Sequence, residues 1–256
     1  MLFRSRSLNA TAASSGNDAL DFQGNEGGVV RNYAEGVISG ARHGITGDKP
    51  VEIENAGTIQ GRLGSGVNLD TAAATSTSIR NLAGGKILGH AEGATDGDAI
   101  DVDGLVDLTN AGTIKADGTS NSGSQTEALA LGGGVVSNSG LISSSQRAVT
   151  VDDSNGGAAF GAVSIDNSGT IEGGEGSAIL VVGDFADTIT NSGVITGSIT
   201  TGGGADVVNL FTGATTGAII ANEAQRNRRG YYAWRNGCYI QRRDGSWIRV
   251  SQRYCY

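Results

Sequence analysis

The stretch SIDNSGTIEGG, residues 164–174, places Ile165, Asn167, Gly169 and Ile171 two positions apart. Spacing by two is typical of β-strands, in which successive side chains point to opposite faces. An Asn and a Gly two apart favour a tight corner, because both residues tolerate a positive φ. The stretch therefore predicts a strand, a corner and a second strand.

The same pattern recurs along most of the chain. Its asparagine returns at intervals of 23 to 29 residues, which is typical of stacked repeats. An apolar residue stands two positions before each asparagine, and a second apolar pair such as Ile100 and Val102 precedes the motif. Each repeat therefore predicts three short strands. The repeated asparagines are Asn32, Asn55, Asn81, Asn110, Asn138, Asn167 and Asn191.

Three strands and three corners predict one coil of a parallel β-helix, so the chain is expected to be all-β with about seven to eight coils. Coils stack about 4.8 Å apart, which lets each asparagine bond the next coil and form a buried amide ladder. Strand alternation places Ile165 inside and Thr150 outside, so we expect Ile165→Asp to destabilise strongly and Thr150→Asp mildly. A flexible low-complexity linker is the disfavoured alternative, because linkers do not keep apolar residues on both sides of a corner.

Composition changes near residue 222. The chain carries a net charge of −8, but residues 223–256 carry +6, which leaves −14 on the rest. The same segment holds seven of the thirteen aromatic residues and both cysteines. These features predict an N-terminal extension (1–15), a β-helix domain (16–222) and a small basic module (223–256). The net charge of −8 argues against generic nucleic-acid binding, which needs a basic face.

The C-terminal module predicts a three-stranded antiparallel meander. Asn236-Gly237 and Asp244-Gly245 are strong hairpin signals between β-favouring residues. Cys238 and Cys255 would close a loop of about 18 residues, worth roughly 3 kcal/mol if oxidised. A disulfide between them is the favoured interpretation, and two free thiols in a reducing compartment is the alternative.

Arginines interleaved with aromatic residues in this module form a candidate site for an anionic sugar polymer, lipid headgroup or nucleic acid, through charge and stacking. Two other interpretations remain open: the two tryptophans could form a small core, or the basic tip could dock on the acidic rod. The candidate ligand-binding residues are Trp234, Arg235, Arg242, Arg243, Trp247 and Arg249.

The stretches NAGTIQG, NSGTIEGGEGSAILVVGDFADTITNSGVITGSI and TGGGADVVNLFTGATTGAI resemble passenger domains of Gram-negative autotransporters. This resemblance covers about residues 16–222. It implies a right-handed parallel β-helix displayed on the cell surface, outside the outer membrane. Passengers of this family include adhesins, biofilm and aggregation factors and some enzymes. Our leading hypothesis for this chain is a secreted, non-enzymatic structural or adhesive rod that contacts cell-surface polymers or associates with itself. The ending resembles the two-Cys, Arg- and Tyr-rich tails of small exported bacterial proteins.

The chain departs from the autotransporter pattern at both ends. The start, MLFRSRSLNATAASS, has no apolar stretch of signal-peptide length, and residues 223–256 are too few for a membrane barrel. A truncated gene fragment is therefore an alternative. The sequence contains no run of 18 apolar residues, so it predicts no helix that spans a membrane.

A polysaccharide lyase or hydrolase is the enzymatic alternative, because such enzymes also use parallel β-helices. Their chemistry needs carboxylates grouped on one outer face. Asp101 and Asp103 are expected to point outward, with Asn68 and Asp70 one coil lower. No aromatic or basic partner lies near them in the sequence, so a solvated acidic patch is favoured. We therefore expect no catalytic residue, metal site or cofactor.

Overall fold

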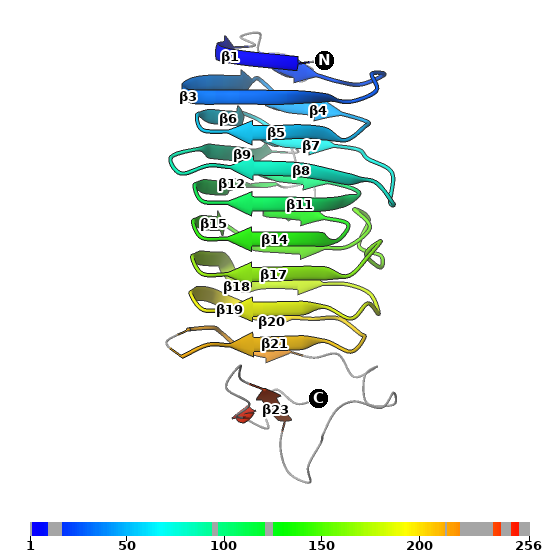
Figure 1. Ribbon diagram of the computed structural model, residues 1–256, viewed down its shortest axis with the longest axis vertical. Helices are drawn as coiled ribbons and strands as arrows, with labels where there is room; N and C mark the ends of the chain where they lie inside the picture. The colour runs from blue at the N-terminus through cyan, green and yellow to red at the C-terminus, as the bar shows by residue number, and fades with distance from the viewer. Residues whose placement is uncertain are drawn as a thin grey trace.

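The computed structural model describes residues 2–9, 17–93, 97–120, 125–212, 214–220, 238–241 and 247–250. Their secondary structure is all-β, and 22 strands form one continuous parallel β-solenoid. The strands stack in three faces along the long axis (Figure 1). No helix in the described part of the chain is long and apolar enough to span a bilayer.

Face A carries the strands that end at the corner asparagines. It consists of β1 (Leu2–Asn9), β3 (Gly28–Gly40), β5 (Val51–Asn55), β8 (Ser76–Asn81), β11 (Leu105–Asn110), β14 (Gly134–Asn138), β17 (Val163–Asn167), β19 (Thr188–Asn191) and β21 (Val207–Leu210).

Face B follows the corner. It continues from the second halves of β1 and β3 through β6 (Thr58–Gly61), β9 (Lys86–Gly93), β12 (Thr113–Ser120), β15 (Leu141–Ser144), the first part of β18 (Thr170–Val181) and the first part of β20 (Val194–Thr200).

Face C closes each turn. It consists of β2 (Leu20–Asp21), β4 (Ile45–Gly47), β7 (Val67–Leu69), β10 (Ile100–Val102), β13 (Glu127–Leu131), β16 (Arg147–Val151), the second parts of β18 and β20, and β22 (Ile219–Ile220).

The solenoid has about six turns, fewer than the seven to eight predicted. Six turns separate the first corner asparagine, Asn32, from the last, Asn191, and β1 and β21 extend face A by one strand beyond them at each end. The first coil is covered by β1, which pairs in parallel with β3. The predicted parallel β-helix of three strands per turn is confirmed.

The core consists of files of apolar side chains in which each turn contributes one residue to each file, and face C carries two such files. On face A, Val136, Ile165 and Ile189 are register partners and are almost fully buried. On face B, Ile142 stacks on Ile171 in the same way. Because every turn covers the apolar residues of its neighbours, a thin core suffices for a chain with few aromatic side chains.

The corner asparagines form a continuous ladder. The amide nitrogen of each of the first six donates to the side-chain oxygen of the next at 2.7–2.8 Å. The same nitrogen donates to a face B carbonyl of the following turn at 3.1–3.2 Å. All seven asparagines are at most 2% exposed. The ladder thereby satisfies the buried amides, except for Oδ1 of Asn32 at its N-terminal end, which has no hydrogen-bond partner.

In the five Asn-x-Gly corners the glycine is required by close packing, not by a positive φ, whereas the two longer corners do contain a positive φ, at Glu35 and Gly84. A Cβ on Gly140 would lie 2.1 Å from the carbonyl oxygen of Gly112, and one on Gly169 would lie 2.2 Å from that of Gly140. Neither glycine has a positive φ, nor does Asn138 or Asn167. The sequence argument from positive φ was therefore wrong: the corners of successive turns stack too closely for a side chain.

Face C contains one strand that the repeat pattern did not show. In β4, Ile45 stacks on Leu20 and Val67, but Gly47 occupies the second apolar position. A Cβ on Gly47 would lie 3.1 Å from the Cβ of Phe22 and 3.3 Å from a methyl of Leu69. The side chains of Phe22 and Leu69 therefore occupy the space that an apolar side chain at position 47 would fill.

Beyond the solenoid, β23 (Cys238–Gln241) and β24 (Trp247–Val250) form an antiparallel pair. Tyr239 is the register partner of Arg249, and Gln241 that of Trp247. The pair matches two strands of the predicted meander.

Candidate functional site

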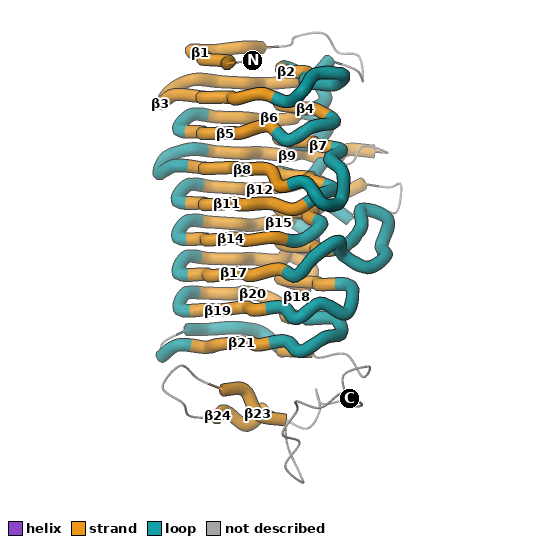
Figure 2. Tube along the Cα trace, turned by 45° about the vertical axis from the view of Figure 1, so that its right-hand side comes forward, coloured by secondary structure: helices purple, strands orange, loops and turns teal. Residues whose placement is uncertain are grey.

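Loops of unequal length connect face C to face A along one edge of the solenoid. In the lower turns this loop edge consists of residues 103–104, 132–133, 152–162, 182–187 and 201–206. Figure 2 shows the loops gathered along that side. In solenoid proteins, insertions of this kind map to one face and often form the binding surface. The loop edge is therefore the candidate binding surface of the solenoid.

The longest of these loops, 152–162, is held by its own carboxylates. Oδ1 of Asp153 accepts hydrogen bonds from the backbone N–H of Asn155 at 3.0 Å and of Gly157 at 2.6 Å. Ser154 has a φ of 63°, in the left-handed region that few non-glycine residues adopt. Its backbone N–H donates to Oδ1 of Asp152 at 2.8 Å. These bonds give the loop a defined shape at the surface.

The loop also reaches back over the preceding turns. The Ser154 hydroxyl donates to Oδ1 of Asp103 at 2.6 Å. The backbone N–H groups of Phe160 and Gly161 donate to the carbonyl oxygen of Gly132 at 2.9 and 3.1 Å. Three turns of the solenoid therefore meet at this point of the loop edge.

A shallow pocket of about 500 Å³ lies where loop 152–162 meets the next two loops. Phe185 is 40% exposed and lines it, while Phe160, beside the lining residue Ala159, is 41% exposed. Asp184 gives the pocket an acidic group at the surface. The remaining lining residues are small: Ala158, Ala159, Val182, Gly183 and Gly203. Exposed aromatic rings beside a concavity are a typical contact surface.

Asp187 lies at the inner side of the same edge and is only 1% exposed. Its Oδ1 accepts from the Val163 N–H at 2.7 Å, while Oδ2 has no hydrogen-bond partner. Burial, with a smaller contribution from the charge of Asp206, raises the pKa of Asp187 to about 6. Burial also raises the pKa of Asp152. The loop edge thus holds carboxyl groups that titrate closer to neutral pH than ordinary aspartates do.

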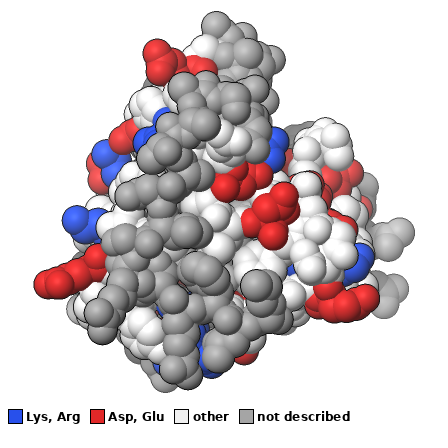
Figure 3. All heavy atoms as spheres, turned by 90° about the horizontal axis from the view of Figure 1, so that it is seen from above, with Lys and Arg blue, Asp and Glu red and all other residues white. Residues whose placement is uncertain are grey.

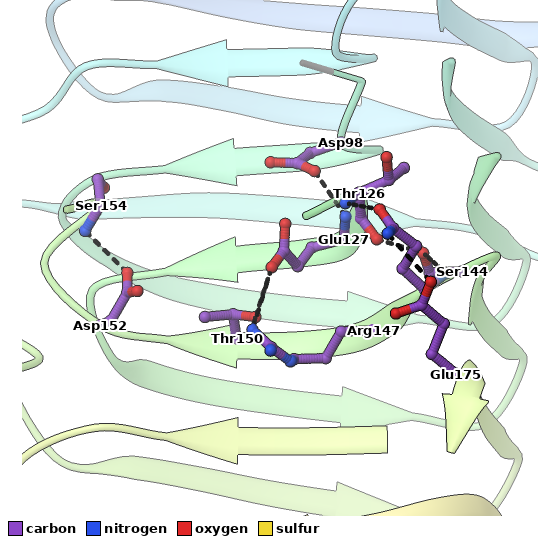
Figure 4. Close-up of polar contacts among 10 residues, drawn as sticks. Asp98, Thr126, Glu127, Ser144, Arg147, Thr150, Asp152, Ser154 and Glu175 are labelled. Atoms are coloured by element: carbon purple, nitrogen blue, oxygen red, sulfur yellow. Dashed lines mark hydrogen bonds and ion pairs between the residues drawn. The ribbon is translucent and has the colours of Figure 1, made fainter. Parts of the chain in front are cut away.

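A second polar cluster lies between faces B and C and is buried (Figure 4). Oε1 of Glu127 accepts from the Thr150 hydroxyl at 2.9 Å and pairs with Arg147 at 3.4 Å. Asp98 accepts from the Glu127 backbone N–H at 2.6 Å. We interpret the cluster as structural, because most of its polar atoms bond one another or the backbone of successive turns, and only Nε of Arg147 and the Thr126 hydroxyl have no hydrogen-bond partner.

This cluster corrects one expectation from the sequence. Thr150 was expected to be exposed, because it alternates with Val149 and Val151. It does alternate with these core residues, yet it is only 4% exposed. Glu127 of the preceding turn and Arg147 of its own strand bond its hydroxyl and cover it.

The acidic patch proposed for the enzymatic alternative is only partly assembled. Asp101 is stacked between Asn68 and Ala130 on face C. Asp103 is instead engaged by Ser154 of loop 152–162. Asn68 donates to Asp70 at 2.9 Å. Among the described residues, no group of three or more His, Cys, Asp or Glu side chains could hold a metal ion.

The predicted residues of the C-terminal module are only partly placed. Trp234, Arg235, Arg242, Arg243 and Cys255 lie outside the described residues. Trp247, Arg249 and Cys238 are described only as members of β23 and β24. The disulfide and the anionic-ligand site therefore stay predictions.

Comparisons with protein-family models, with curated proteins and with solved structures find no match to this chain.

Proposed function

We propose that this chain is a non-enzymatic, extracellular structural or adhesive rod that contacts cell-surface polymers or sister molecules, in the manner of an autotransporter passenger. The observation that carries the proposal is the unbroken asparagine ladder through the solenoid. A ladder of this kind gives a stiff support that repeats identical contacts along its length. The sequence resemblance of residues 16–222 supports the location at the cell surface.

The outer surface supports contact over an area. Exposed positions of face A carry short polar side chains such as Thr109, Ser137 and Ser164. The loop edge adds the exposed rings of Phe160 and Phe185 beside a shallow concavity. Exposed aromatic groups dominate the energy of many contact surfaces. We therefore place the adhesive contact at the loop edge, around these two rings.

The test measures binding and turnover in one experiment. The full chain is passed over immobilised polygalacturonate, dextran and a second sample of the chain itself, and released oligosaccharides are assayed. We expect binding to at least one surface without release of products. Binding should weaken about tenfold when Phe160 and Phe185 are both replaced by Ser, as for the loss of a contact worth about 1.4 kcal/mol.

A matched control separates the loop edge from general surface hydrophobicity. Val135 and Val207 lie on face A and are 47% and 44% exposed, close to the values for the two phenylalanines. Their replacement by Ser should leave binding unchanged. Absence of binding to all three surfaces contradicts the proposal. Product release that disappears in Asp101→Ala and Asp103→Ala would support the polysaccharide-active alternative.

A further inference from the structure

The C-terminal end of the solenoid exposes its core. Ile189 and Ile199 are fully buried in the last complete turn. Their register partners in the terminal turn are Val208 and Ile219, and both are only partly buried. The terminal turn therefore leaves apolar surface that the next turn would cover if the stack continued.

The sequence of the terminal turn stops the stack. Leu210 occupies the position of the corner asparagine, since it is the register partner of Asn191. Asn191 donates instead to the backbone carbonyl of Thr215 at 2.9 Å. The side chain of Leu210 has no amide group. The corner asparagine of a further coil of the same type would therefore find no donor for its side-chain oxygen and would stay unsatisfied. The end of the solenoid is suited to a different kind of cover.

The backbone of the terminal turn also directs hydrogen-bonding groups toward the open end of the solenoid. The backbone N–H groups of Val207 and Phe211 donate to the backbone carbonyl oxygens of Asp187 and Asn191 in the preceding turn. In a parallel ladder alternate residues point to opposite neighbours, so the N–H groups of Val208 and Leu210 face the open end. Exposed strand edges promote association, and solenoids need terminal caps of a different character.

The chain itself supplies a suitable cover immediately afterwards. Strand β23 contacts β21 of the terminal turn and lies just below it in Figure 1. Residues 223–256 carry +6, whereas the rest of the chain carries −14. Acidic side chains appear on several sides of the solenoid when it is viewed along its axis (Figure 3). Opposite charge attracts the tail to the rod and repels the end of a second acidic rod.

We propose that the hairpin β23–β24 is the cap of the solenoid and lies over Val208, Leu210 and Ile219. The cap covers the open apolar end and prevents rods from stacking end to end. This inference does not depend on the adhesive function, because it concerns the end of the rod and not the loop edge.

The tryptophans provide a first test in the full chain. Trp247 belongs to β24, and the other tryptophan, Trp234, lies four residues before β23 in the sequence, so tryptophan emission reports on the C-terminal segment alone. Leu210→Asp, in the terminal turn, should shift the emission maximum to longer wavelength and increase quenching by acrylamide. Val135→Asp, at an exposed position of face A, is the matched control and should change neither. Identical emission and quenching in both variants and the unchanged chain would overturn the proposal.

A second test leaves the solenoid unaltered. Ile240 and Ile248 are register partners in the hairpin, so Ile240→Asp places a charge at its centre. Hydrogen exchange at the amides of Val208 and Leu210 should become about tenfold faster in this variant, while exchange in β14 stays the same. Equal exchange in both proteins contradicts the cap.

Light scattering identifies the competing occupant. We expect the full chain to be monomeric and Ile240→Asp to associate as its concentration rises. If the unchanged chain already forms end-to-end dimers, and Ile240→Asp has the same mass, a second copy covers the end and the proposal is wrong.

Discussion

The chain turns in two different ways. It uses a regular corner between faces A and B and loops of variable length at the loop edge between faces C and A. The corner repeats one Asn-x-Gly pattern, and its asparagines are buried and bonded from turn to turn. The loop edge varies in length, and its longest loop carries exposed Phe160 and strained Ser154. Identical turns can share one ladder, whereas each loop must satisfy its own polar groups. The regular corner therefore stabilises the solenoid, whereas the variable loop edge is available for contact with other molecules.

The largest effect is expected in the core that both edges enclose. Ile165 is 1% exposed and lies between Val136 and Ile189. Ile165→Asp buries an unpaired charge and should lower the free energy of unfolding by about 4 kcal/mol or more. Urea unfolding followed by circular dichroism measures the change. A loss below about 1 kcal/mol would mean that the site is accessible to water.

At the corner, Asn138→Ala should cost about 3 kcal/mol, because it interrupts the ladder at a buried site. The change removes the acceptor of Asn110 and the donor to Asn167, both bonded at 2.7 Å. Ser137→Ala on the exposed side of the same strand is the control and should be within about 0.5 kcal/mol of the unchanged chain. Equal unfolding midpoints for the two variants would show that the ladder contributes little.

Thr150→Asp should cost about 2 kcal/mol, because the new carboxylate lies against buried Glu127 and only Arg147 offsets the repulsion. This expectation replaces the mild effect inferred from alternation alone. Thr109→Asp on face A is the comparison: Thr109 is exposed and stacks on Arg80, so its replacement should be neutral. A neutral Thr150→Asp would contradict the buried cluster.

The loop edge should make stability depend on pH through Asp187. Its pKa is raised to about 6 in the folded chain, so between its ordinary value and 6 the folded state binds a proton that the unfolded chain releases. The contribution of this group to the free energy of unfolding therefore falls as pH rises through that window, by about 1–3 kcal/mol.

The measurement for Asp187 compares urea unfolding at pH 5 and pH 7 in the unchanged chain and in Asp187→Asn. The variant should lose the part of the pH dependence that this carboxyl provides. The same difference between the two pH values in both proteins would show that Asp187 is an ordinary carboxylate.

The smallest effect is expected at the surface of the loop edge. Ser154→Ala removes one exposed hydrogen bond to Asp103 and should change the free energy of unfolding by less than about 0.5 kcal/mol. Hydrogen exchange within residues 152–162 should still increase, since the loop loses its tie to the preceding turns. A loss of stability similar to that of Asn138→Ala would show that the loop edge contributes as much to stability as the corner does.

Much of the solenoid follows from spacing in the sequence. The seven asparagines picked out by the repeat are the residues that form the ladder, and the apolar residues two positions before them lie in one core file. Strand β4 was missed because Gly47 supplies no apolar side chain where Phe22 and Leu69 fill the space. The contact of Ser154 with Asp103 joins residues 51 apart, and no local pattern indicates it.

The sequence by itself determined the period, the corners and the side of the strand on which each residue lies, because these depend on neighbours a few positions away. Only the tertiary structure decided which outward residues are covered. Thr150 and Thr109 have the same local pattern, but Thr150 faces Glu127 of the preceding turn while Thr109 faces solvent. It also decided why the corners need glycine, since the obstructing carbonyl belongs to another turn. Burial in a solenoid depends on what the stacked turns place above and below each residue.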